Sequence, residues 1–108
     1  MKISGTNLSM IRGDSECIKV TCDPAFSAGD TVAMQVRQSA DDETAFITKE
    51  VTEFDDGAAY INILPEDTAS LEAGRYVYDI DVRWANGMKK TIVEKSAFTI
   101  REDVTRID

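Results

Sequence analysis

Two aspartates, Asp79 and Asp81, are the residues of this chain best spaced to bind an ion. They fall in a stretch where apolar and polar residues alternate, so their side chains share one face of a strand and lie about 7 Å apart. Two such carboxylates can share a calcium ion if a loop carbonyl contributes. Arg83 continues the same face, and a solvated row of mixed charges accounts for the spacing without a ligand. We therefore predict no metal site and keep calcium at Asp79 and Asp81 as the alternative.

Two acidic clusters offer a second route to calcium or to an acidic docking patch. One is Asp41-Asp42-Glu43, and the other combines Glu53 with Asp55-Asp56. They could form such a site if they met at one end of the fold. Solubilising charge on turns is the simpler interpretation of runs of this kind.

The residue types present do not support catalysis. The chain has no histidine, which removes the commonest general base and every Ser-His or Cys-His nucleophile pair. Paired carboxylates can hydrolyse glycosides in a cleft, but a chain of 108 residues uses its apolar side chains for the core. We predict no enzyme, no catalytic residue and no cofactor.

Cys17 and Cys22 lie five residues apart in one expected strand, which separates them by roughly 16 Å. A disulfide needs α-carbons within about 7 Å, so we expect two free thiols in a reducing compartment. Two isolated cysteines without histidine do not make a zinc site either.

Three residues are candidates for contact with another protein. Trp84 stands at a strand end beside the turn residues Asn86-Gly87, where it serves either as an exposed contact or as the rim of the core. Val104 and Ile107 lie among charged residues in segment 101–108, which could extend to cover a neighbouring molecule.

Strand patterns recur along the chain with turn residues between them. The expected strands are 7–11, 16–22, 31–38, 45–54, 58–64, 76–84 and 89–100, the last with a bulge near Lys95-Ser96. Strands 45–54 and 58–64 read as a hairpin through Asp55-Asp56-Gly57. A single helical turn is expected within 67–73.

Seven short strands predict an all-β, seven-stranded antiparallel immunoglobulin-like sandwich that forms one domain over residues 1–108. The pattern Leu71-x-x-Gly74-x-Tyr76 is typical of its crossover into a central strand, where the tyrosine hydroxyl can bond nearby backbone. Alternation assigns the core to apolar residues of these strands. They are Ile18, Val20, Val32, Met34, Val36, Ile61, Ile63, Ile80, Val82, Ile92, Phe98 and Ile100.

Charge and hydropathy restrict the partners. Twenty acidic and twelve basic residues give a net charge of −8, which disfavours nucleic acid and anionic membrane surfaces. No run approaches the roughly 20 apolar residues of a membrane helix, and the start lacks an apolar core of secretory length. We expect the protein to remain in the cytoplasm where it is made.

Several segments together resemble small immunoglobulin-like domains of tailed bacteriophages and prophages, in particular the amino-terminal domain of siphophage baseplate upper proteins. They are Arg12-Gly13-Asp14, the strand from Val32 to Arg37, Leu64-Pro65-Glu66-Asp67-Thr68, Tyr76-Val77-Tyr78-Asp79-Ile80 and the closing run from Phe98 to Arg106. The resemblance covers nearly the whole chain, and its motifs are those of a fold.

The resemblance implies a non-enzymatic structural or assembly protein of the phage particle. Because no coiled coil or receptor-binding module follows the domain in this sequence, we expect a small tail, baseplate, head-tail or virion-associated protein. Its partners would be other virion proteins or itself, and it would pass from the host cytoplasm into the virion. The alternative is a bacterial immunoglobulin-like module that binds a carbohydrate or a protein.

Overall fold

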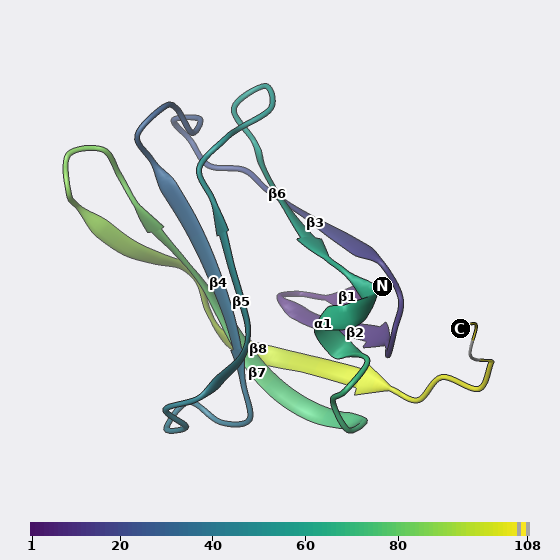
Figure 1. The fold of residues 1–108 in the computed structure, drawn as a ribbon. Helices are drawn as coiled ribbons and strands as arrows, with labels where there is room; N and C mark the ends of the chain where they lie inside the picture. Colours follow the sequence, from purple (N-terminus) through teal and green to yellow (C-terminus); the bar gives the residue numbers. More distant parts are fainter. Residues whose placement is uncertain (106, 108) are drawn as a thin grey trace.

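The computed structural model describes residues 1–105 and 107, and these form eight strands and one short helix, so the predicted all-β class is confirmed. The strands make two sheets that face each other in a sandwich-like arrangement (Figure 1). The larger sheet has the order β1 (Lys2–Ser4), β2 (Asn7–Ile11), β8 (Lys89–Arg101), β7 (Gly74–Arg83), β4 (Thr31–Arg37) and β5 (Ala45–Val51). The smaller sheet pairs β3 (Glu16–Val20) with β6 (Ala59–Ile63).

The described part of the chain departs from the seven-stranded antiparallel prediction in two ways. An extra strand, β1, precedes β2, and its three residues are too few for an alternating pattern to be recognised. Strands β2 and β8 are parallel, with Leu8 opposite Phe98 and Met10 opposite Ile100, so the larger sheet is mixed. Two segments from opposite ends of the sequence are thereby fixed side by side.

The predicted hairpin of 45–54 with 58–64 is wrong. Strand β5 ends at Val51 and belongs to the larger sheet, whereas β6 belongs to the smaller one. The Asp55-Asp56-Gly57 turn does form, with positive φ at Asp56 and Gly57 and an isolated bridge between Asp55 and Ala58. It passes the chain from one sheet to the other.

Strand β3 is also shorter than expected, because it ends at Val20 rather than at residue 22. Cys17 therefore lies on the strand and is exposed, while Cys22 follows it and is half-buried. Both are free thiols in this structure.

The core lies between the two sheets and follows the predicted alternation. All the predicted core residues are buried except Ile18 and Ile92, which are half-buried and pack against the core. Further buried residues lie where the alternation of apolar and polar residues covers only a short run, or where the side chain is aromatic. They are Leu8, Met10, Phe26, Ile47, Ala58, Ala59, Tyr76 and Tyr78.

Strand β8 is interrupted near the predicted bulge. Tyr78 pairs with Ser96 but Ile80 pairs with Val93, so β8 carries one residue more than β7 over this interval. A second shift follows at once, because Asp81 pairs with Thr91, and this turns Ile92 partly away from the core.

The helix α1 (Pro65–Thr68) begins two residues before the predicted turn. The Asp67 carboxylate accepts the Leu64 N–H at 2.7 Å and pairs with the Lys49 ammonium at 2.7 Å. Because Lys49 is on β5, this ion pair ties the larger sheet to α1. The Tyr76 hydroxyl donates to the Glu72 carbonyl at 2.7 Å, which is the corner bond expected from the sequence.

The strand directions collect the loops at two ends of the molecule. Loops 21–30, 52–58 and 84–88 lie together at the top of Figure 1. The β2–β3 turn, loop 38–44, α1 and the segment after β8 belong to the opposite end. No helix in the described range is long and apolar enough to cross a membrane.

Candidate interaction surface

The three predicted contact residues are divided between the two ends. Trp84 follows β7 and is half-buried against the core. Its backbone N–H donates to the Met88 carbonyl at 2.8 Å, which closes the β7–β8 turn. It therefore occupies the rim of the core. Val104 and Ile107 lie beyond β8, at the other end, and both are almost fully exposed.

Loops 21–30, 52–58 and 84–88 form the end of the molecule around Trp84, which we call the three-loop end. A buried aspartate helps to hold it together. Asp30 is 5% exposed, and its carboxylate accepts N–H groups of Ser27 at 3.0 Å and Ala85 at 2.9 Å. A Cβ on Gly57 would lie 2.6 Å from the Cβ of Ala25, so only glycine fits there. These contacts join the loops to one another.

The two acidic clusters do not meet. Asp41, Asp42 and Glu43 precede β5, and Glu53, Asp55 and Asp56 follow it, so the length of β5 separates them. The idea that they meet in one site is wrong. Among residues 1–105 and 107, no three Cys, Asp or Glu side chains are grouped to hold a metal ion.

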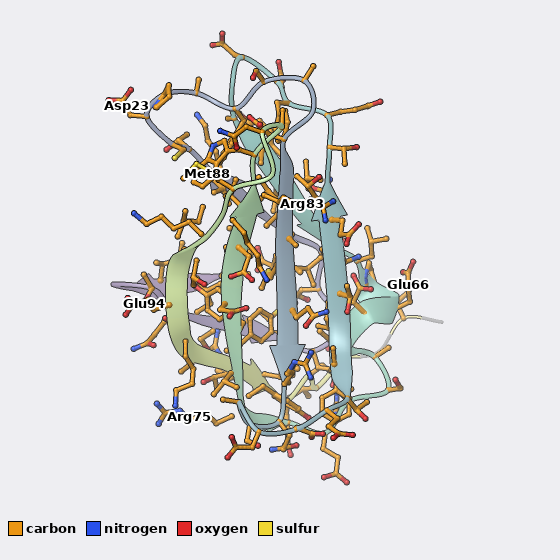
Figure 2. The ribbon with its side chains drawn as sticks, turned by 90° about the vertical axis from the view of Figure 1, so that its left-hand side faces the viewer. Asp23, Glu66, Arg75, Arg83, Met88 and Glu94 are labelled. Atoms are coloured by element: carbon orange, nitrogen blue, oxygen red, sulfur yellow. The ribbon has the colours of Figure 1, made fainter. Side chains whose placement is uncertain are left out.

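Asp79 and Asp81 lie on the outer face of the larger sheet, as expected, and both are half-buried (Figure 2 shows this face, with Arg83 at the end of β7). Asp81 accepts the Thr91 hydroxyl at 2.9 Å and lies 3.4 Å from the Lys89 ammonium. Burial, followed by the charge of Asp81, raises the pKa of Asp79, while Arg37 and Lys89 act in the opposite direction. These contacts agree with the row of mixed charges.

The root of the segment after β8 is fastened by Arg12. The backbone N–H of Arg12 donates to the Arg101 carbonyl at 2.8 Å and extends the parallel pairing of β2 with β8. Its guanidinium donates to Asp103 Oδ1 at 2.9 Å and to the Leu71 carbonyl at 3.1 Å. One arginine thus joins β2, the loop after α1 and the segment that follows β8.

Beyond that root the chain stands away from the sandwich. We call residues 102–105 and 107 the arm, and in Figure 1 this segment projects to the right of α1. Val104 is 96% exposed and Ile107 is 94% exposed. Single exposed apolar side chains are common on protein surfaces, whereas several gathered at one place mark contact sites.

A groove of about 1020 Å³, which we call the arm groove, separates the arm from the body. One wall is the arm itself. The other wall combines Ile11, Arg12, Gly13 and Asp14 of the β2–β3 turn with Pro65, Glu66 and Ala69 in and after α1. The Gly13 N–H donates to the fully buried Thr68 hydroxyl at 2.8 Å, which fixes that turn against α1.

The arm groove combines apolar side chains with an excess of carboxylates. Its apolar lining consists of Ile11, Pro65, Ala69, Val104 and Ile107. Among the described lining residues, the carboxylates belong to Asp14, Glu66, Glu102 and Asp103, and the cation belongs to Arg12, which pairs with Asp103. This lining suits non-covalent binding through apolar contact and charge.

Sequence reasoning identified Val104 and Ile107 but missed the opposite wall. Ile11 ends a strand whose alternation was visible, and Pro65 was recognised only as part of a crossover. Their proximity depends on the parallel pairing of β2 with β8, for which the sequence carries no local signal.

No protein-family model matches the sequence, and no curated protein matches it. The surfaces of the chain itself therefore carry the functional conclusion.

Proposed function

We propose that this protein is an immunoglobulin-like module that acts through protein contacts, as a non-enzymatic structural or assembly component of a bacteriophage or prophage particle. The arm groove is the single observation that carries the proposal. It gathers Ile11, Val104 and Ile107, three of the exposed large apolar residues of the described chain, at one end.

The immunoglobulin-like assignment is supported by the order of the strands. In that fold the second and fifth strands share one sheet, while the third, sixth and seventh share the other. Here β3 and β6 correspond to the second and fifth strands, and β4, β7 and β8 correspond to the third, sixth and seventh. Strands β2 and β5, in the first and fourth positions, lie in the larger sheet instead of the smaller one. The bond from the Tyr76 hydroxyl to the Glu72 carbonyl fits the tyrosine corner of the same fold.

Open sheet edges also favour an assembly role. In the described part of the chain, β1, β5 and both strands of the smaller sheet have one edge without a partner. Such edges offer unpaired N–H and C=O groups to a neighbouring chain. In a particle built from many copies of several proteins, edges of this kind become contact surfaces.

The resemblance to phage domains supplies the biological setting of the proposal. A component of this kind is made in the cytoplasm of the bacterial host and becomes part of the virion. Its partners are other virion proteins or further copies of itself. The net charge of −8 is consistent with contacts to protein rather than to nucleic acid.

The exposed aromatic residues give little support to a carbohydrate-binding module. Among the described residues, the large aromatic side chains that are exposed are Phe46 on β5 and Tyr60 on β6. They lie on different sheets and form no common platform for a sugar ring.

The proposal is tested by asking whether the chain enters particles. Quantitative mass spectrometry of gradient-purified particles from a bacterium carrying the gene is expected to find the chain at a fixed ratio to the other particle proteins. The double variant Val104→Asp/Ile107→Asp is expected to fold, by circular dichroism, but to be depleted from particles. The control is Ile3→Asp/Met88→Asp, which changes two residues that are each 66% exposed and lie outside the arm groove.

A chain that is absent from particles contradicts the proposal. Incorporation of Val104→Asp/Ile107→Asp at the level of the control variant contradicts the role of the arm groove.

A further inference from the structure

We propose that the arm groove receives a short basic amphipathic segment of a different protein, with alternating cationic and aliphatic side chains. This inference rests on the proposed function and names the chemistry of the partner at the same site. Three features of the groove support it: the sign of its charge, the distribution of its apolar residues, and its size.

Among the described residues that line the arm groove, carboxylates outnumber the cation Arg12, which is already paired with Asp103. The Arg12 guanidinium donates within the chain, to the Asp103 carboxylate and to the Leu71 carbonyl. Asp14 and Glu66 are exposed on one wall, and Glu102 is exposed on the other. A segment lying between the walls therefore meets carboxylates from both sides, and lysine or arginine side chains complement them.

The apolar residues are placed to contact the same segment. Ile11, Pro65 and Ala69 line the body side, and Val104 and Ile107 line the arm side. Aliphatic side chains of the partner can pack between these walls while its cations reach the exposed carboxylates at the rim. The alternation of the two types in the partner follows from this arrangement.

The size of the groove favours a peptide segment over a small molecule. A volume of about 1020 Å³ lies at the upper limit of small-molecule pockets, which are largely enclosed and apolar. This groove is bounded on one side by an arm whose Val104 and Ile107 are almost fully exposed. Because this side is open to solvent, the groove can admit an extended segment.

A second copy of this chain fits the groove less well. The arm of another molecule would bring its own exposed Glu102 against the Asp14 and Glu66 wall. Like charges placed opposite each other across an interface oppose association. The net charge of −8 adds repulsion between whole molecules.

The test uses the full chain labelled with ¹⁵N and three capped synthetic peptides of about ten residues, a length that matches an extended segment in such a groove. The first alternates lysine with leucine, the second replaces every lysine by glutamate, and the third replaces every leucine by serine. Binding of the lysine-leucine peptide is expected to shift the amide signals of Gly13, Ala69 and Thr105, while Gly87 at the opposite end stays fixed. Affinity is expected to fall several-fold when salt is raised from 0.05 to about 0.3 M, because the exposed charges are screened.

A matched pair of variants tests the role of the groove carboxylates. Asp14→Asn/Glu66→Gln is expected to weaken the lysine-leucine peptide several-fold. Asp41→Asn/Glu43→Gln removes the same charge from exposed residues of the 38–44 loop and is expected to leave affinity unchanged. An equal loss in both variants would mean that only the net charge of the protein matters, and would overturn the inference.

The remaining outcomes separate this inference from the proposed function. Equal binding of the glutamate-leucine peptide, or no binding of the lysine-leucine peptide, overturns the basic partner. So does a dimer of the chain alone in sedimentation velocity that is lost in Val104→Asp/Ile107→Asp. In each case, entry of the chain into particles that depends on the arm would still support the proposed function. Entry that does not depend on the arm would contradict both the inference and the role of the arm groove in the proposed function.

Discussion

The Tyr76 hydroxyl donates a 2.7 Å hydrogen bond to the carbonyl of Glu72, four residues earlier in the chain. The bond closes the loop that leaves α1 onto the first residues of β7. Arg12 donates to the carbonyl of the neighbouring Leu71 in the same loop, at 3.1 Å. The loop next to the arm groove is therefore held from β7 and from β2.

Replacing Tyr76 by Phe is expected to lower the free energy of unfolding by about 1 kcal/mol, the net worth of one neutral hydrogen bond. The aromatic ring remains and keeps its place in the core, so the loss isolates the hydroxyl. Urea denaturation followed by circular dichroism measures it. The control Tyr60→Phe, at an exposed position on β6, should change stability by less than about 0.5 kcal/mol, as surface substitutions do. Equal effects of the two variants would count against the corner bond.

Ile80 lies at the centre of β7 with 2% exposure, between Met34 of β4 and Val93 of β8. Ile80→Ala is expected to cost about 2 to 4 kcal/mol, from lost burial and from the cavity left behind. Ile3→Ala, at an exposed position on the short edge strand β1, should cost less than about 0.5 kcal/mol. A loss below about 0.5 kcal/mol for Ile80→Ala would place it outside the core.

Asp30 is predicted to hold the three-loop end together. Asp30→Ala leaves the N–H groups of Ser27 and Ala85 without their acceptor and should cost about 2 to 3 kcal/mol. Hydrogen exchange of these two amides should accelerate by more than the global loss of stability explains. Glu53→Ala removes an exposed carboxylate from the same end and should leave both quantities unchanged. Unchanged exchange at Ala85 in Asp30→Ala would contradict the role of this carboxylate.

Asp79 is predicted to oppose folding at neutral pH. Its folded pKa is raised, chiefly by burial, so the folded state binds the proton more tightly than the unfolded state. The stability that this more tightly bound proton contributes is fully present below the unfolded pKa of about 3.9 and is lost as pH rises through the folded pKa. Asp79→Asn should therefore raise the melting temperature at pH 7, and the gain should shrink as pH falls towards 3.9.

Glu94→Gln is the control for Asp79→Asn, because it removes one exposed carboxylate from β8 and so has the same effect on net charge. A gain for Asp79→Asn that equals that of Glu94→Gln, or that does not depend on pH, would show that burial of Asp79 has no effect on stability.

Local patterns in the sequence carry much of the fold. Alternation in Val32, Met34 and Val36 marks a strand whose inward residues are fully buried, and the Leu71-x-x-Gly74-x-Tyr76 spacing locates the corner. The residue types Asp56-Gly57 predict a turn because they tolerate positive φ angles, and both residues adopt them in the structure.

Pairing between distant segments could not be predicted in the same way. The Asp56-Gly57 turn says that the chain reverses, but not that β5 and β6 then join different sheets. The parallel contact of Met10 with Ile100 depends on the whole sandwich being assembled. For this reason Val104 and Ile107 could be proposed as contact residues from their own apolar character, while Ile11 and Ala69 on the facing wall could not.

Site-specific photocrosslinking in assembling cells tests the central claim most directly, that this protein works through contacts made at its arm. A photoreactive phenylalanine analogue is placed at Val104 in one variant and at Met88 in another, since both side chains are exposed but they lie at opposite ends. After irradiation, mass spectrometry identifies the proteins joined to each position. We predict one defined adduct with a particle protein from position 104 and none from position 88. No adduct from position 104, or the same adducts from both positions, would contradict the account.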